Sequence, residues 1–433
     1  MCSLSATAAL EESPHAMLRD RLLSLSDDRC LTDILQVVGE QVFHSTAPTF
    51  WRRTYGRLHP GKEPYATLVF ESKRPSQLLC RIDLFSDGAA AANEASARRE
   101  TWLQLLAANS DQSISPPLNA CQPHESLGWI LAATFPCDGA LPTLPSVMAI
   151  NPTPHVVRYR PDRRCTVRQT GESGTLFGKV FTHVEEGYQQ HLDAIRLHDA
   201  ATRGELAFAV APPHHWDDQR LCLWHDALPG EPLDHDDFAV DGDRLARRLG
   251  EALASLANST LKPPKVFGPV EQWQRTVRTA DDLARRVPAL RQDLDDFLFD
   301  LKRLHLAFQA RPLRPIHGSP HAKQWLDQGE RLGLVDFEKL CLGDPELDLG
   351  TFLAELDFED PREINIPLVA TAFIQGFEAH AGKVDHCRLT AYRAHKQLVK
   401  ALKSAQSLRI DGDHRARRHL QRAINGLRRN VES

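Results

Sequence analysis

The chain has 433 residues, a length that predicts two or three domains and is ample for a large buried core. Hydrophobic residues make up 42% of the chain and charged residues 25%, which excludes a disordered or fibrous protein. The 52 Lys and Arg residues against 57 Asp and Glu residues give a net charge of −5, so bulk charge favours neither nucleic acid nor an anionic membrane as a partner.

The sequence shows no sign of membrane insertion or secretion. The nearest apolar window, Leu127 to Phe135, is far too short to span a bilayer. Residues 1–12 lack the basic start of a secretory signal, and we expect a cytoplasmic protein. The nine cysteines never form C-x-x-C, which is typical of separate reduced thiols and not of disulfides or a zinc site. Nothing in the sequence indicates an oligomeric state.

The first part of the chain predicts helices, then strands, then another helix. Apolar residues recur at threes and fours over residues 14–45, which predicts one or two helices. Apolar runs at 65–70 and 78–85 predict a β-hairpin, and an alanine-rich stretch at 89–108 predicts a helix. Eight prolines between residues 109 and 155 predict loops or a linker, so we place a domain boundary near residue 150.

After this boundary the order strand, strand, helix recurs. Residues 155–169 and 176–181 predict a second hairpin, and residues 184–201 predict a helix. The string R-L-H-P-G-K at 57–62 echoes R-Y-R-P-D-R at 158–163, which leaves an internal duplication open. From residue 240 onward the period is helical, apart from a β-rich island at 313–337.

Three blocks in and after this island carry the chemistry. They read I-H-G-S-P-H-A-K-Q-W-L-D from Ile316, L-G-L-V-D-F-E from Leu332 and G-D-P-E-L-D-L-G from Gly343. Their order and spacing closely resemble the catalytic region of the aminoglycoside phosphotransferase and choline-kinase-like enzymes, whose pattern begins H-G-D-x-x-x-x-[N/Q]. The resemblance covers about residues 150–400.

The resemblance implies an α+β fold, namely the two-lobed protein-kinase-like fold. Its small β-rich N-lobe and hinge would be residues 151–228, and its mostly helical C-lobe residues 229–433. An extra α+β domain of unknown role would precede them at residues 1–150, with a degenerate N-lobe-like repeat as one interpretation.

The implied activity is transfer of the γ-phosphoryl group of ATP or GTP to a hydroxyl of a small molecule, with Mg²⁺ as cofactor. By resemblance, Asp336 and Gln324 would hold the metal through hard oxygen atoms. Lys179, in the strand-like L-F-G-K-V-F, would neutralise the α- and β-phosphates. Glu186 or Glu185 on the next helix would orient this lysine, and the choice between them stays open.

The remaining nucleotide contacts are positional predictions. The turn at 160–164 lies where kinases place a glycine-rich phosphate loop but contains no glycine, so Arg160 would contact phosphate through its side chain or be a solvated residue. The segment 221–228 resembles the hinge between lobes, where main-chain groups at Trp224, Asp226 and Ala227 would bind adenine.

One departure from the family pattern bears on catalysis. Ser319 stands where the family has its catalytic aspartate, and a serine hydroxyl is not a base at neutral pH. Three interpretations follow. The chain is a phosphotransferase in which His321 or Glu338 accepts the proton; it is a nucleotide-binding pseudokinase that regulates or scaffolds; or it transfers a nucleotidyl group.

The resemblance also gives His317 and Asp348 a structural role in bracing the loop. The acceptor is open. Acidic residues at 355, 357, 359 and 360 suit a cationic aminosugar or form a solvated helix end, and a neutral sugar is equally compatible. The basic stretch at 392–429 is typical of a solvated helix face, with an anionic-ligand site as the alternative.

Overall fold

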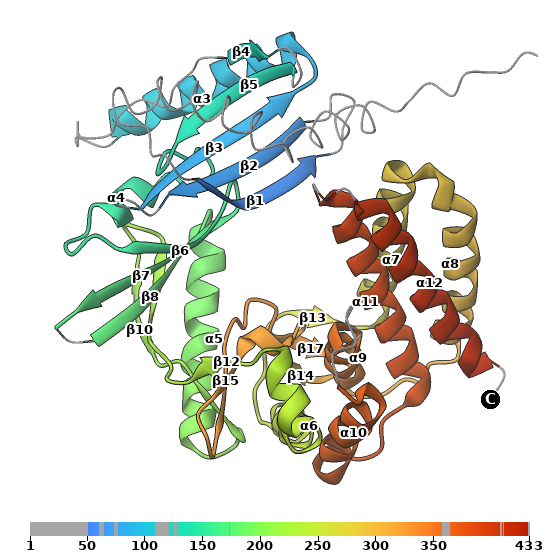
Figure 1. The fold of residues 1–433 in the computed structure, drawn as a ribbon. Helices are drawn as coiled ribbons and strands as arrows, with labels where there is room; N and C mark the ends of the chain where they lie inside the picture. The colour runs from blue at the N-terminus through green and yellow to red at the C-terminus, as the bar shows by residue number, and fades with distance from the viewer. Residues whose placement is uncertain are drawn as a thin grey trace, which may run out of the picture. The chain divides into compact units, whose positions relative to one another are not determined.

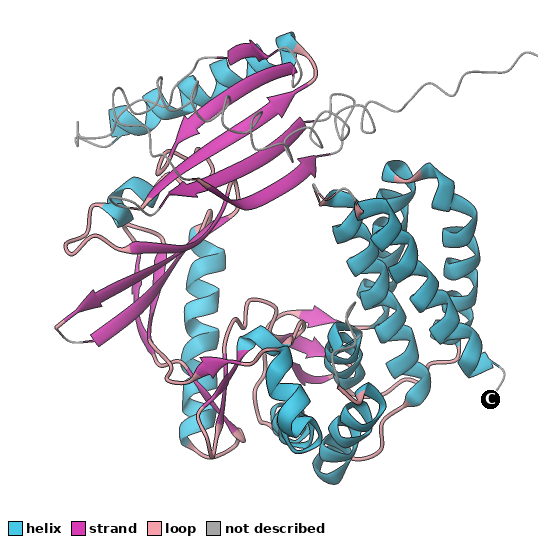
Figure 2. Cartoon of the chain, in the orientation of Figure 1, coloured by secondary structure: helices cyan, strands magenta, loops and turns pink. Residues whose placement is uncertain are grey.

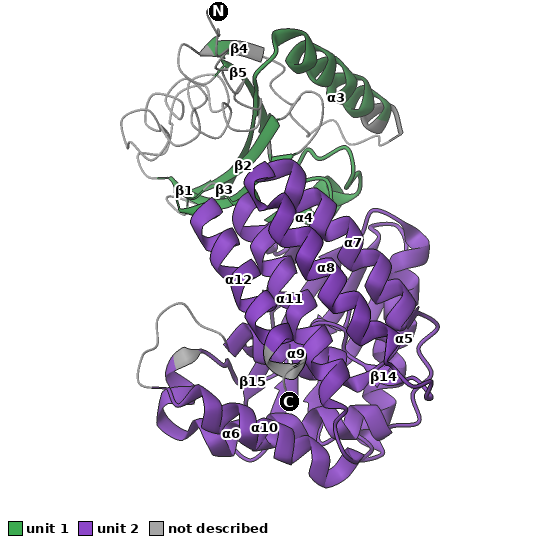
Figure 3. Ribbon diagram, turned by 90° about the vertical axis from the view of Figure 1, so that its right-hand side faces the viewer, with its two compact units in different colours: residues 1–149, 158–165, 406–412 green, residues 150–157, 166–405, 413–433 purple. Residues whose placement is uncertain are grey.

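The computed structural model of the protein describes residues 51–59, 65–72, 77–108, 121–124, 128–172, 174–356, 364–407, 409 and 411–431. The chain forms two compact units (Figure 3). Unit 1 is Met1–Ala149 with Arg158–Cys165 and Gln406–Gly412, and unit 2 is Ile150–Val157, Thr166–Ala405 and Asp413–Ser433. The chain therefore passes between the units five times.

Unit 1 contains a five-stranded sheet of order β1-β2-β3-β5-β4 whose neighbours all pair antiparallel (Figure 1). Its elements are β1 (Arg52–His59), β2 (Tyr65–Ser72), β3 (Leu78–Phe85), α3 (Gly88–Ala108), β4 (Cys121–His124), β5 (Gly128–Thr134) and α4 (Leu144–Met148). Helix α3 packs on the sheet through Ala91 and Ala95, which contact Phe85 and Leu131. The predicted hairpin and the predicted helix that follows it are confirmed.

Unit 1 contains an ionic cluster built around a buried aspartate. Asp83 on β3 has no exposed surface and accepts hydrogen bonds from Arg81 Nε at 2.7 Å and from Arg98 Nη1 at 2.6 Å. Arg81 also donates two 2.7 Å hydrogen bonds to Asp162, in the turn within the segment Arg158–Cys165. Asp138 accepts from the backbone N–H of Asp162 at 2.9 Å. Charge-assisted bonds of this kind are the strong ones, so they fix this turn within unit 1.

A second five-stranded sheet, of order β10-β11-β8-β7-β6, belongs to unit 2 except for the end of β6 and the start of β7, which are assigned to unit 1. Its elements are β6 (His155–Arg160), β7 (Arg164–Gly171), β8 (Gly174–Val180), α5 (Val184–Thr202), β10 (Pro213–Asp217) and β11 (Cys222–Asp226). Helix α5 lies close to the sheet because Gly187 leaves room for the Trp216 ring, which a Cβ at this position would approach to 2.3 Å. The helix predicted at 184–201 is confirmed.

The two sheets share one strand order. In each, three consecutive strands lead into a helix, and the next two strands of the sheet join the third strand in reverse order, giving first-second-third-fifth-fourth across the sheet. Asp83 lies five residues before the start of α3, and Lys179 lies five residues before the start of α5. Counted back from the helix, the same position thus carries opposite charges in the two sheets.

The rest of unit 2 is mostly helical (Figure 2). Its helices are α6 (His235–Asn258), α7 (Pro269–Arg286), α8 (Arg291–Leu306), α9 (Pro345–Leu356), α10 (Ile366–Ala381), α11 (His386–Gln406) and α12 (Gly412–Val431). Helices α7, α8, α11 and α12 share one apolar core, and α6, α9 and α10 share another with β9 (Phe208–Val210). None of the described helices is both long and apolar enough to span a bilayer.

Two small sheets carry the three sequence blocks. One has the order β12-β15-β16-β9 and the other β13-β17-β14. Their remaining strands are β12 (Glu231–Pro232), β13 (Val266–Phe267), β14 (Arg314–Ile316), β15 (Trp325–Asp327), β16 (Leu332–Leu334) and β17 (Cys341–Gly343). The β-rich island predicted at 313–337 is confirmed, and it extends to residue 343.

The proline-dense stretch is where the prediction was wrong. Residues 121–124 and 128–134 form β4 and β5 instead of loops. Pro123 is tolerated because β4 is an edge strand. On its outer side there is no neighbouring strand, so no N–H donor is needed there. Strand β1 was not predicted at all, and the helices predicted at 14–45 lie outside the described residues.

Candidate active site

The turn after β14 is built around a glycine and a buried carboxylate. Gly318 has φ +80°, and a Cβ there would lie 2.4 Å from the carbonyl oxygen of Lys339. Asp348 on α9 accepts from the backbone N–H groups of His317 and Gly318 at 2.7 and 2.8 Å. Burial raises the pKa of Asp348 to about 7, against the opposing effect of these two hydrogen bonds. The expected structural roles of His317, which is fully buried, and Asp348 are confirmed.

Asp336 lies two residues after β16 in a left-handed backbone conformation, with φ +70°. Few residues other than glycine adopt this conformation. The adjacent carbonyl of Val335 accepts from His317 Nε2 at 3.2 Å, and the N–H of Val335 donates to the carbonyl of Gln324 at 3.0 Å. The first and second sequence blocks are thereby joined directly.

The Asp336 carboxylate contacts two of the residues singled out from the sequence. Lys179 Nζ lies 3.5 Å from Oδ1, and Gln324 Nε2 donates to Oδ2 at 3.2 Å. Lys179 comes from β8, where it pairs with Leu223 of β11, and it also forms an ion pair with Glu338. Residues 157 positions apart thus meet at one point in unit 2.

The predicted partners of Lys179 on α5 are placed differently. Glu185 and Glu186 are exposed in the first turn of the helix. The ion pairs that the structure records for Lys179 run to Asp336 and Glu338. Since Glu338 is bound to this ammonium, it is less suited to accept a proton than the sequence alone indicated.

The donor atoms at this point are compatible with a magnesium ion bound together with phosphates. Mg²⁺ is usually held by one or two carboxylates plus substrate phosphates and water, and not by an all-protein cage. Among the described residues no group of three or more His, Cys, Asp or Glu side chains could hold a metal ion alone. Asp336 offers two carboxylate oxygens, and Gln324 lies next to it with an amide oxygen that now accepts from the N–H of His321 at 3.0 Å.

Ser319 and His321 follow the glycine turn, and both side chains are half-buried. Desolvation lowers the pKa of His321, which favours the neutral form of its imidazole. The histidine backbone is fixed by the bond to Gln324. A neutral imidazole two residues from Ser319 is therefore a possible proton acceptor in this loop.

The predicted hinge residues lie on and after β11. Trp224 is buried under β8, where a Cβ at Gly178 would lie 2.8 Å from its ring. Asp226 Oδ1 lies 3.1 Å from His214 Nδ1, and the N–H of Ala227 donates to the carbonyl of Thr175 at 2.9 Å. Trp224 thus packs as a core residue. Arg160 is the last residue of β6 and is assigned to unit 1, whereas the other predicted site residues are assigned to unit 2.

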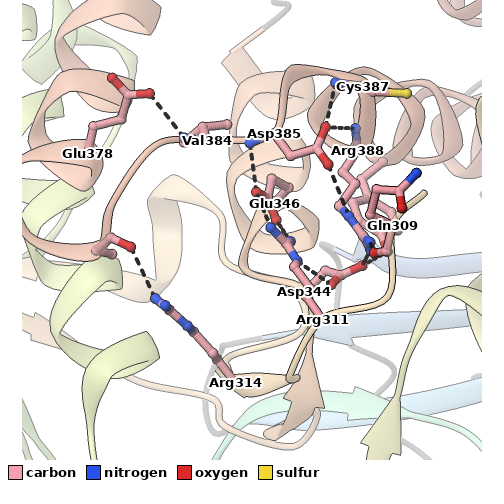
Figure 4. A network of polar contacts seen from close by, with 12 residues as sticks. Gln309, Arg311, Arg314, Asp344, Glu346, Glu378, Val384, Asp385, Cys387 and Arg388 are labelled. Atoms are coloured by element: carbon pink, nitrogen blue, oxygen red, sulfur yellow. Dashed lines mark hydrogen bonds and ion pairs between the residues drawn. The ribbon is translucent and has the colours of Figure 1, made fainter. Parts of the chain in front are cut away.

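The sequence did not indicate the ionic network around the third block (Figure 4). Asp344, fully buried, accepts from Arg311 Nε at 3.1 Å and also binds Arg388 and the Tyr392 hydroxyl. Glu346 binds Arg311 and accepts from the N–H of Asp385 at 3.0 Å. This network anchors the start of α9, the helix that carries Asp348. A buried G-D-P aspartate with arginines at 311 and 388 leaves no periodic signal in the sequence.

Comparison with known proteins decides the family. A model described as the phosphotransferase enzyme family (APH) matches residues 164–384, just over half of the chain. The chain belongs to this phosphotransferase family. The matched segment includes Lys179, the three blocks and Asp336. Membership supports a small-molecule kinase, and it agrees with the protein-kinase-like fold, which unit 2 shows as a β-sheet N-lobe and a helical C-lobe.

Several solved structures are similar to this family member. A choline/ethanolamine kinase family protein from Mesorhizobium loti has 18% identity and TM-score 0.44, covering 66% of this chain and 97% of that one. A choline kinase from Streptococcus pneumoniae has 15% identity and TM-score 0.42, covering 64% and 92%. An amicoumacin kinase solved with AMP-PNP and Ca²⁺ has 14% identity and TM-score 0.45, covering 63% and 88%. No curated protein sequence matches the chain.

Proposed function

We propose that this chain transfers the γ-phosphoryl group of ATP or GTP to a hydroxyl of a small molecule. The observation that carries the proposal is the meeting of Lys179, Gln324 and Asp336 within 3.5 Å contacts in a member of the phosphotransferase family. Phosphoryl transfer depends mainly on placing the phosphates and neutralising their charge. A lysine, a carboxylate and an amide oxygen are the groups that this task requires.

Each residue has a defined part in the proposed reaction. Lys179 binds the nucleotide phosphates, and Asp336 with Gln324 holds Mg²⁺, which supplies charge neutralisation when bound. The acceptor oxygen forms a bond to the γ-phosphorus while the bond from that phosphorus to the β,γ-bridging oxygen breaks, and the nucleoside diphosphate leaves. The acceptor proton goes to the neutral imidazole of His321, and Ser319 hydrogen-bonds the acceptor hydroxyl.

A second candidate is a nucleotide-binding pseudokinase. Ser319 favours it, because this residue cannot act as the base that the family places there. Nucleotidyl transfer is the third candidate. The products separate the three: a phosphotransferase releases nucleoside diphosphate, a nucleotidyltransferase releases pyrophosphate, and a pseudokinase releases neither.

The test of the nucleotide site is a thermal-shift titration with ATP and GTP, each with and without Mg²⁺. Ligand that binds only the native state at 100 times its Kd stabilises that state by about 2.7 kcal/mol. We expect a magnesium-dependent shift in the wild type that is lost in Asp336→Asn. Asp199→Asn, an exposed position on α5, is the matched control and should keep the shift. No shift with any nucleotide would contradict the proposal.

A further inference from the structure

One face of α11 carries a row of lysines next to the proposed site. Lys396, Lys400 and Lys403 are spaced by four and three residues, which places them on the same side of the helix. Lys396 is only 7% exposed, and its Nζ lies 3.1 Å from Glu355 Oε1. Lys400 Nζ lies 3.4 Å from Glu355 Oε2 and donates to the carbonyl of Ala354 at 2.9 Å.

These contacts change the role that we assign to Glu355. Burial would raise the pKa of Glu355, but Lys396 and Lys400 more than offset this and lower it to about 2. Its charge is thus matched by two ammonium groups and is not available to attract a cationic aminosugar. The other acidic positions of that run, 357, 359 and 360, lie outside the described residues.

Two further cations, Arg275 and Lys339, lie near this row of lysines. A 2.6 Å hydrogen bond between Thr276 Oγ1 and His395 Nδ1 joins α7 to α11, and the adjacent residues Arg275 and Lys396 interact electrostatically. The main chain of Lys339 lies against Gly318, the residue before Ser319. We call Arg275, Lys339, Lys396, Lys400 and Lys403 the basic cluster.

Electrostatic effects within the cluster show that its members lie near one another. Desolvation, followed by the charges of Arg275, Lys396 and Lys403, lowers the pKa of Lys339 to about 8. Lys396 has its pKa lowered by burial in spite of its bond to Glu355. Within the described ranges, neither Arg275 nor Lys339 forms an ion pair with an acidic side chain. The cluster therefore carries more positive charge than the described acidic groups beside it neutralise.

The basic cluster borders the loop that we assign to the acceptor. Glu355 and Asp336 raise the pKa of His321, whereas Lys396 and Lys403 lower it, so two members of the cluster act on this loop. A cationic group of the acceptor that lay against the basic cluster would meet like charge, whereas an acid group would form charge-assisted hydrogen bonds with it. The cluster would thus favour an acceptor with a negative charge over one with a positive charge.

We propose that the acceptor is an anionic hydroxylated small molecule, whose carboxylate or phosphate binds the basic cluster while its hydroxyl faces Ser319 and His321. The proposal rests on the phosphotransferase function proposed above. It makes Arg275 and Lys339 specificity-determining residues, because both offer donors that no described acid occupies.

The first test is protection from amine labelling, read by peptide mass spectrometry on the full chain without nucleotide or Mg²⁺. The probes share one carbon skeleton at constant ionic strength: gluconate, glucose 1-phosphate, glucose and glucosamine. We expect gluconate or glucose 1-phosphate to slow acetylation of Lys339 and Lys396 at least about fivefold, and glucose and glucosamine to leave it unchanged. The two anions separate a carboxylate site from a phosphate site. Lys302, exposed on α8, is the internal control.

A matched pair of variants makes the test specific. Arg275→Gln should abolish the protection of Lys339, whereas Arg291→Gln, an exposed arginine on α8, should retain it. Protection by glucosamine, equal protection at Lys302, or no protection by either anion would overturn the proposal. So would displacement of the anions by ATP with Mg²⁺, since the cluster would then belong to the nucleotide site. Anion protection without any nucleotide-induced thermal shift would leave an anion site but contradict the phosphotransferase function.

Discussion

Asp336 combines an unfavourable backbone conformation with a central chemical position. A non-glycine residue held in a sparsely populated conformation costs about 1–3 kcal/mol, and such residues persist where the surroundings fix them. Here the backbone before Asp336 is held by two hydrogen bonds of Val335: its carbonyl accepts from His317, and its N–H donates to Gln324. The turn directs the carboxylate to Lys179 and Gln324. The strain therefore supports a functional role for this side chain.

The role of His321 can be tested by exchanging the base. His321→Asn should lower kcat by about 10²–10⁴, the usual contribution of a general base. Ser319→Asp in that background should restore part of the loss, because it places a carboxylate where the family has one. Desolvation lowers the pKa of His321, so the wild type should keep its activity to a lower pH than an ordinary histidine allows and lose it as the imidazole becomes protonated.

The measurement is a pH profile of kcat for the three proteins. The acidic limb due to His321 should disappear in His321→Asn and be replaced by a carboxylate limb in the double variant. An unchanged kcat in His321→Asn, with the acidic limb still present, would show that another group accepts the proton.

At the level of elements, the approach of α6 to α10 is set by two glycines. A Cβ at Gly250 would lie 2.1 Å from the carbonyl oxygen of Phe373, and one at Gly376 would lie 2.2 Å from that of Arg247. Both obstacles are backbone atoms, which cannot move aside as a flexible side chain can. The close packing supports the apolar core that also contains α9 and Leu334 of β16, two residues before Asp336.

We predict that Gly250→Ala destabilises the protein by about 1–3 kcal/mol, the usual cost of overpacking a core. Gly426→Ala in α12 is the control, since a Cβ there meets nothing within 4 Å. That control should gain up to about 1 kcal/mol from improved helix propensity. Chemical denaturation measures both, and equal effects of the two substitutions would contradict the packing argument.

Local pattern predicted those elements and roles whose signal lies in consecutive residues. The hairpin at β2 and β3 and the helices α3 and α5 follow from periodicity, and the bracing role of Asp348 follows from the resemblance of its contiguous motif to the family pattern. Strands β4 and β5 were missed because proline density outweighed their apolar pattern. The Asp344 network and the basic cluster depend on pairings between distant segments, such as Asp344 with Arg388, which no sequence period encodes. The cationic acceptor lost its main support for the same reason, since Lys396 lies 41 residues after Glu355.

For the molecule as a whole, Arg81 matters because it joins separate segments of unit 1. It binds Asp83 on its own strand and Asp162 in the turn between β6 and β7, and its side chain is 5% exposed. Removing one partner of a buried ion pair costs about 3–5 kcal/mol, because the remaining charges stay buried. We therefore expect Arg81→Met to destabilise the protein by that amount, less what Arg98 still contributes at Asp83.

The matched control for Arg81 is another arginine of the same sheet. Arg52→Met removes an ion pair to Glu71 whose arginine is 65% exposed, and surface pairs contribute about 0–1 kcal/mol. Urea unfolding of both variants measures the difference. Equal stability of the two would show that the buried cluster does not hold the turn.

Two sheets of one strand order could in principle bind two nucleotides in a single chain. The sign of one side chain argues against that stoichiometry. Where unit 2 has Lys179, unit 1 has Asp83, already bound to two arginines and closed off from solvent. A phosphate would meet a carboxylate there and not an ammonium group, so we expect one nucleotide for each chain. The sheet of unit 1 shares the strand order of a binding lobe, but its charged groups are part of a buried cluster.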